Sequence, residues 1–267
     1  MAAAEFLRRA LSGNLRALTA WCLGIAALIA VVAAIFPSLE GASDIDELLQ
    51  SYPEALRELF GLSAGSFTTG AGFLDAELFS LVLPLFVIVL AVSSGARTFA
   101  GEEDSGRLEL VLAYPVRRGE AVLWKGVAVA AEIVVACVAG FVAIAVLDPI
   151  VGLDLSVGRI AAAMGSVAAL GLLHGWLALG LGAAVPSRLV AIGVPAALAA
   201  AGYLVGGLHG LAGWLDPLRV LSPFWWVGSS PLQGGVRPGG VAIVLTAAIV
   251  CLVAGALLVE RRDLRTP

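Results

Sequence analysis

Six continuous apolar runs constrain this chain more than any other feature of its sequence. Each run is about 20 residues long, which is enough to cross about 30 Å of hydrocarbon as a helix. Uninterrupted runs are typical of membrane-spanning helices, because the strands of membrane β-barrels alternate apolar and polar residues. The predicted spans are residues 17–36, 76–96, 126–147, 160–185, 189–208 and 239–259.

The composition excludes soluble and disordered classes of protein. Apolar residues make up 60% of the 267 residues and charged residues 13%, whereas soluble domains are about 45–50% apolar and about 25% charged. That apolar excess is too large for one water-facing core. We therefore expect an all-α polytopic membrane protein with six transmembrane helices.

Neither the cysteines nor the lysine indicates a chemical site. Cys22, Cys137 and Cys251 each lie inside an apolar run, which favours packing roles over a disulfide framework. The single lysine, Lys125, follows Leu123 and Trp124, so the G-x-x-x-x-G-K-[ST] pattern of a phosphate-binding loop is absent around it. The chain itself is not expected to bind ATP in that manner.

The distribution of basic residues predicts the orientation of the spans. With the N-terminus in the cytoplasm, 12 of the 16 basic residues fall in cytoplasmic segments and 4 fall outside. Cytoplasmic loops of membrane proteins carry an excess of lysine and arginine. Both termini are therefore expected to be cytoplasmic.

Two of the predicted external segments are too irregular to be spans. Residues 41–75 combine helically spaced apolar residues with an acidic face, which predicts an amphipathic segment that caps the bundle; a substrate lid is the alternative. Residues 209–238 hold three tryptophans and four prolines, which favours short re-entrant or interfacial helices over a seventh span.

The cytoplasmic loop over residues 97–125 contains a short amphipathic helix that Tyr114-Pro115 ends, an element suited to docking on a soluble partner. The sequence of this loop resembles that of the ABC-2 type permease family, the membrane subunits of ABC exporters. In that family the corresponding loop has the form E-E-x-x-G-x-x-E-x-x-L-x-x-P-V-x-R and ends in a lysine before the third span. The matching residues are Glu102, Glu103, Gly106, Glu109, Leu112, Pro115, Val116, Arg118 and Lys125.

This resemblance, which also covers the order of the spans, implies a single ABC-2 type transmembrane domain over residues 1–267. It implies two permease subunits, as a homodimer or with a related chain, and two separate ATP-binding subunits that hold ATP and Mg²⁺. The chain itself would carry no cofactor and bind no nucleic acid. The loop would be the coupling helix that seats on the ATPase, through Glu102, Glu103, Gly106, Leu108, Leu112, Pro115 and Arg118.

Two polar residues inside the spans are candidates for the transport cavity. Glu132 lies about two turns into the third span, where a carboxylate is costly and indicates function by default. It would line the cavity, bind cationic cargo or pair with a basic residue; a helix–helix hydrogen bond is the structural alternative. His174 stands beside Gly171 and Gly175, whose spacing predicts close helix approach, and lacks partners for a metal site.

The leading hypothesis is the permease of an ATP-driven exporter of hydrophobic or amphipathic compounds, such as drugs, antibiotics or lipids, in a bacterial cytoplasmic membrane. A membrane-embedded lipid-processing enzyme is one alternative, but it would need acidic or histidine side chains clustered at one membrane face, and Glu132 and His174 are isolated. A non-transporting anchor or sensor is the other, and the coupling-type loop argues against it.

The orientation can be tested by cysteine labelling in intact cells. Residues 102–120 should be cytoplasmic and residues 41–75 and 211–236 external, because that arrangement places most basic residues inside. A Glu109→Cys variant should therefore resist a membrane-impermeant maleimide, while a Ser51→Cys variant should react. Labelling at position 109 would contradict the orientation.

Overall fold

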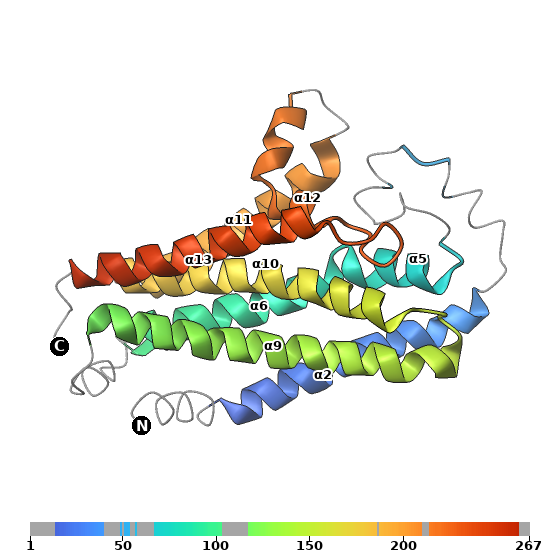
Figure 1. Ribbon diagram of the computed structural model, residues 1–267, viewed down its shortest axis with the longest axis horizontal. Helices are drawn as coiled ribbons and strands as arrows, with labels where there is room; N and C mark the ends of the chain where they lie inside the picture. The colour runs from blue at the N-terminus through green and yellow to red at the C-terminus, as the bar shows by residue number, and fades with distance from the viewer. Residues whose placement is uncertain are drawn as a thin grey trace.

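In the computed structural model the chain forms a bundle of helices that run roughly along one direction (Figure 1). The structure describes residues 14–39, 49, 51–53, 57, 67–102, 117–185, 187–209 and 214–261. The first long helix begins, and the last one ends, at the same end of the bundle (Figure 1). This is the arrangement that an even number of spans requires.

Among the described residues, six helical segments are long and apolar enough to cross a membrane. Each coincides with one of the predicted spans, so the predicted all-α, six-span architecture is confirmed. The second segment is composite, and its turns η2 and η3 are π-helical. The elements are α2 (Leu15–Ile35) with η1 (Phe36–Ser38), then α5 (Gly70–Leu74), η2 (Asp75–Phe79), α6 (Val82–Ala96) and η3 (Arg97–Gly101), then α9 (Arg118–Val151), α10 (Val157–Ala184), α11 (Arg188–Leu208) and α13 (Pro238–Glu260).

The second and third spans are longer than their apolar runs. The second begins at Gly70, where the Thr69 hydroxyl accepts the Gly72 N–H at 3.1 Å and caps α5. The third begins at Arg118, so Lys125 lies inside α9 and not at its boundary. Both extensions add charged or polar residues, which hydropathy alone does not include.

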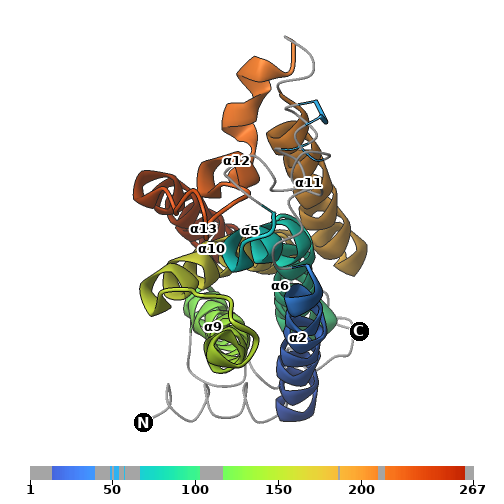
Figure 2. The same cartoon turned by 90° about the vertical axis from the view of Figure 1, so that its right-hand side faces the viewer.

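Helix α10 occupies the middle of the bundle, with α6 and α13 packed against it (Figure 2). Glycines make this approach close. A Cβ atom at Gly95 would lie 2.2 Å from the Gly175 carbonyl oxygen, and one at Gly255 would lie 2.4 Å from the Gly180 Cα. The predicted close approach at Gly175 is therefore confirmed, and Gly180 and Gly255 form a second such contact.

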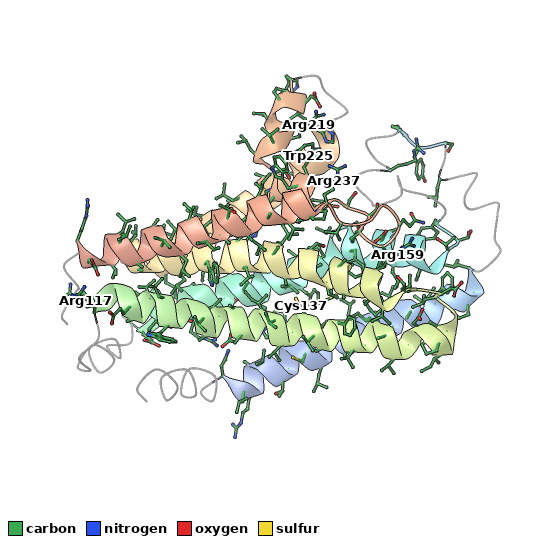
Figure 3. The ribbon with its side chains drawn as sticks, in the orientation of Figure 1. Arg117, Cys137, Arg159, Arg219, Trp225 and Arg237 are labelled. Atoms are coloured by element: carbon green, nitrogen blue, oxygen red, sulfur yellow. The ribbon has the colours of Figure 1, made fainter. Side chains whose placement is uncertain are left out.

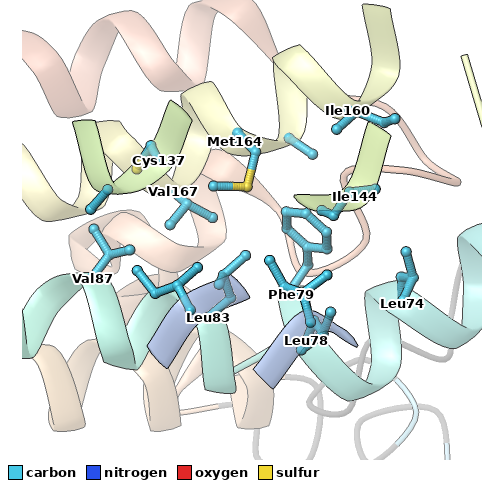
Figure 4. Packing of buried hydrophobic residues seen from close by; sticks show 14 of the residues in the cluster. Leu74, Leu78, Phe79, Leu83, Val87, Cys137, Ile144, Ile160, Met164 and Val167 are labelled. Carbon is cyan, nitrogen blue, oxygen red and sulfur yellow. The ribbon is translucent and has the colours of Figure 1, made fainter. Parts of the chain in front are cut away.

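The main apolar core lies between the second span, α9 and α10 (Figure 4). The second span contributes large aliphatic and aromatic side chains, and Met164 fills the gap between helices with its flexible thioether. Cys137 packs here as a small apolar residue and is a free thiol. The labelled core residues are Leu74, Leu78, Phe79, Leu83, Val87, Cys137, Ile144, Ile160, Met164 and Val167.

A fully buried carboxylate fixes the segment before the last span. Asp75, in η2, accepts the backbone N–H of Leu232 at 3.0 Å and that of Gln233 at 2.8 Å. The Gln233 side chain in turn donates to the Thr69 hydroxyl at 3.1 Å. These bonds attach the turn before α13 to the start of the second span.

The segment between α11 and α13 holds only the short helices η5 (Asp216–Leu221) and α12 (Pro223–Val227) in its described part. With six and five residues, neither can cross a membrane, as the sequence predicted. Ser222 joins this segment to α11, because its hydroxyl donates to the Gly202 carbonyl at 2.6 Å. The two short helices project away from the bundle (Figures 1 and 2).

The predicted external amphipathic segment, residues 41–75, lies mostly outside the described residues. Its last part, from Gly70, is the helix α5 that continues into the second span.

The Gly180–Gly255 contact predicts which glycine of α10 tolerates a side chain. A Gly180→Val variant should lose about 1–3 kcal/mol of unfolding free energy, because its side chain would overlap α13. Gly165→Val is the matched control, since nothing lies within 4 Å of a Cβ atom there. Denaturation of the purified full chain in detergent micelles measures both; equal losses would contradict the close contact.

Candidate functional site

A buried lysine holds the end of the second span against α9. Lys125 is 2% exposed, and its Nζ donates to the Glu102 carboxylate and to the Thr98 carbonyl oxygen. The ammonium also lies 5.4 Å from the centroid of the Phe99 ring. A buried charge requires such partners, since an unpaired ammonium in an apolar environment is costly. Thr98 and Phe99 lie in the π-helical turn η3, and Glu102 directly follows it.

Glu132 is the centre of a second polar cluster at the same end of the bundle. It is 3% exposed and accepts hydrogen bonds from Asn14 Nδ2 at 2.9 Å and from Ser94 Oγ at 2.5 Å. Arg97 Nη2 lies 3.6 Å from its carboxylate, and Arg97 Nη1 donates to Asn14 Oδ1 at 2.5 Å. The cluster thus joins the residue before α2, the end of the second span and α9.

Together these contacts form what we call the charge ladder: the pairs Glu102–Lys125 and Arg97–Glu132. Lys125 and Glu132 are seven residues apart, two turns of helix, so they lie on the same face of α9. The second span runs antiparallel to α9 and presents Arg97 and then Glu102 to that face. Each charged side chain therefore pairs with one of opposite sign. The two pairs hold the second span and α9 together where the chain leaves and re-enters the bundle.

Five of the seven predicted coupling residues lie outside the described residues: Glu103, Gly106, Leu108, Leu112 and Pro115. The other two flank this stretch. Glu102 follows η3 and pairs with Lys125, and Arg118 is the first residue of α9, where it is exposed. The stretch from 103 to 116 is thus joined at both ends to helices that the charge ladder connects.

His174 is buried on α10, where its Nδ1 lies 2.8 Å from the Leu170 carbonyl oxygen of the preceding turn. Its ring centroid is 6.4 Å from that of Phe224 in α12. The structure does not bring His174 and Glu132 into one site, because the partners of Glu132 come from other elements. Across the described ranges no three metal-ligating side chains gather in one place.

An apolar groove of about 400 Å³ lies between α6 and α11. This volume falls within the range of about 300–1,000 Å³ that is usual for small-molecule pockets. Its polar groups are few, Ser93 and Tyr203 among them. The other lining side chains include Leu81, Leu85, Ile88, Val89, Val92, Ile192, Leu204 and Phe224.

A comparison with protein families adds to this geometry. The model of the family described as ABC-2 family transporter protein matches residues 15–264. This range includes all six spans, the charge ladder and the 103–116 stretch. The chain belongs to the ABC-2 transporter family. A comparison with curated proteins finds none that matches.

Membership identifies the chain as the membrane permease component of an ABC-2 type transporter, and it confirms the resemblance seen in the sequence. ABC-2 permeases work with ATP-binding subunits, and the permease domain carries neither an ATPase site nor a cofactor. The absence of a phosphate-binding loop around Lys125 agrees with this division of labour. The permease is a multi-pass membrane protein.

Sequence reasoning singled out Glu132 but missed its partners Asn14, Ser94 and Arg97. A usable signal was present. In antiparallel spans joined by one loop, residues equally far from the loop lie at similar depth, so a basic residue at the end of the second span should face an acidic residue early in the third. Asn14 and Ser94 carried no such signal, since isolated polar residues at helix ends are common.

A double-mutant cycle tests the bond between Ser94 and Glu132 of the permease. The coupling free energy between Ser94→Ala and Glu132→Ala should be about 0.6 kcal/mol and at most about 1.7 kcal/mol, the range for hydrogen bonds between membrane helices. Unfolding of the full chain in micelles provides the measurement. Ser93→Ala, an exposed neighbour on α6, should show no coupling to Glu132; equal coupling for both serines would contradict the contact.

Proposed function

We propose that this ABC-2 permease is the membrane subunit of an ATP-driven exporter, energised by two separate ATP-binding subunits. The observation that carries the proposal is the charge ladder, which joins the two ends of the 103–116 stretch to the helices of the bundle. A segment that receives force from a soluble partner needs a rigid connection to the spans it moves. The two pairs provide that connection, because Lys125 and Glu132 are almost fully buried and loss of a partner would leave a buried charge unpaired.

In this proposal the 103–116 stretch is the coupling helix. Leu108 and Leu112 insert into a groove on the ATPase, since apolar anchors dominate small interfaces. Glu103, Gly106 and Pro115 shape the stretch, and Glu102 and Arg118 mark its ends. Movement of the ATPase subunits then reaches the second span through Glu102–Lys125 and the start of α2 through Arg97 and Asn14.

The exported compounds are proposed to be hydrophobic or amphipathic, in the manner of drugs, antibiotics or lipids. Support comes from the α6–α11 groove, whose lining is almost entirely apolar and whose volume suits a drug-sized molecule. Helix α11 is also peripheral, since most of its side chains are not buried within the bundle. A second permease copy, identical or related, would face this groove and close a cavity between the two subunits.

We assign Glu132 to positioning the helices and not to contact with cargo, because its carboxylate already has three partners within this chain. His174 is the better candidate for an effect on cargo. Its ring lies beside Phe224, which lines the α6–α11 groove. We further propose that the whole chain, 1–267, is one transmembrane domain.

We propose a bacterial cytoplasmic membrane as the location, with both termini in the cytoplasm. The distribution of basic residues supports this orientation, since it places the charge ladder and the 103–116 stretch on the side where ATP-binding subunits are found. The membrane-enzyme hypothesis has no support in the described residues, where no cluster of acidic and histidine side chains occurs.

The coupling role of Leu112 can be tested in the assembled transporter. Leu112→Asp should lower cargo-stimulated ATP hydrolysis roughly tenfold or more, because loss of an apolar anchor commonly costs 2 kcal/mol or more. The variant permease should still insert into the membrane. Arg107→Thr, a change in the same stretch that leaves the apolar residues in place, is the control and should retain stimulation. Full stimulation by the Leu112→Asp variant would contradict the proposal.

A further inference from the structure

Two arginines converge on one tryptophan beside the short helices that project from the side of the bundle. The Arg219 guanidinium carbon lies 5.3 Å from the Trp225 ring centroid, and that of Arg237 lies 5.7 Å from it. Figure 3 shows the three side chains together, in and beside the short helices that project from the bundle. Basic residues in the predicted external segments are the exception in the sequence, 4 of 16, and two of those four meet here.

Within the described part of the chain, one carboxylate pairs with one of these two arginines. Asp216 lies 2.6 Å from Arg219 and neutralises it. No carboxylate of the described residues lies within 4 Å of the Arg237 guanidinium, which stands over the Trp225 ring. Asp75 is the other nearby acid, but it is fully buried and its oxygens are occupied by the Leu232 and Gln233 N–H groups. Counted over the residues that the structure describes, the cluster therefore carries an excess positive charge.

The start of α13 adds to this positive potential. Arg237 is the N-cap residue of this 23-residue helix, its side chain makes no capping bond, and the first turn contains no acidic residue. The amino end of a helix carries a partial positive charge and exposed N–H groups, which favour anions. The charge of Arg237 and the dipole of α13 thus act at the same place.

A cavity of about 160 Å³ opens beside this cluster. Hydroxyl groups line it alongside the aromatic rings, and Ser80 and Ser166 are almost fully buried. The volume is smaller than the roughly 300–1,000 Å³ of a drug-sized pocket, so it suits a single polar group. Its polar and aromatic lining includes Ser80, Ser166, Tyr203, Trp225, Ser230 and Arg237.

We infer that this cavity binds the phosphate of an anionic phospholipid headgroup, from the leaflet opposite the charge ladder. Arginine is suited to phosphate through its planar set of donors, and α13 supplies a second attraction. A lipid is favoured over free phosphate because large apolar side chains stand exposed on the adjacent helix η5: Val220 is 50% exposed and Leu221 76%. Acyl chains would cover these side chains while the headgroup occupies the cavity. The inference holds whatever cargo the permease carries.

The test is native mass spectrometry of the purified full chain in detergent, titrated with phosphatidylglycerol and with phosphatidylcholine of the same acyl chains. The wild-type chain should bind phosphatidylglycerol about tenfold more tightly, and Arg237→Gln should lower that affinity about tenfold, as expected for loss of a charged hydrogen-bond donor. Arg159→Gln is the matched control. It removes another arginine of the same side, which lies away from Trp225 in Figure 3, and should leave the affinity unchanged.

Three results would overturn the inference. Equal binding of the two lipids by the wild-type chain would exclude a site for anionic headgroups, even if Arg237→Gln failed to fold. An equal loss in the Arg159→Gln variant would indicate a general charge effect. Displacement of phosphatidylglycerol by millimolar inorganic phosphate would make free phosphate, and not lipid, the ligand. An Arg237→Lys variant keeps the charge but loses the planar set of donors, so its affinity for phosphatidylglycerol should fall between those of the wild-type chain and Arg237→Gln.

Discussion

The pairing of buried charges between the second span and α9 determines the arrangement of this permease at one end of its bundle. A carboxylate or ammonium in a membrane-spanning helix costs about 2.5–3.5 kcal/mol even on a mild scale. Glu132 and Lys125 are tolerated because Arg97 and Glu102 meet them from the antiparallel helix. Satisfying these charges also brings Asn14 to Glu132, which fixes the start of α2. One electrostatic requirement therefore orients three elements.

The second span carries a polar anchor at each of its ends. Glu102 bonds to Lys125 at one end, and Asp75 holds the turn before α13 at the other. Between these anchors residues 81–92 are all apolar, and Gly95 packs closely against Gly175 of α10. Because helices in lipid gain little from the hydrophobic effect, close packing and hydrogen bonds must hold them together. A force applied at the 103–116 stretch would thus pass along a span that is attached at both ends.

The two proposed sites lie in different parts of the molecule and differ in whether their charges are paired within the chain. The charge ladder is neutralised within the chain, which suits a mechanical role. The Arg219–Trp225–Arg237 cluster keeps an excess charge beside an open cavity, which suits a ligand. The α6–α11 groove between them is apolar and suits hydrophobic cargo. Each assignment follows from whether the charges at that place are already satisfied.

Sequence alone determined the class and the six spans, because continuous apolar runs and a short loop motif are local properties. It also identified Glu132 as unusual. Only the tertiary structure decided what Glu132 contacts, since Asn14 and Ser94 are 118 and 38 residues away along the chain. The same holds for Arg237, whose contact with Trp225 and adjacent cavity depend on how α12 packs against α11 and α13. Continuous apolar runs specify which residues enter the membrane, whereas side-chain contacts between helices depend on their packing, which no single segment encodes.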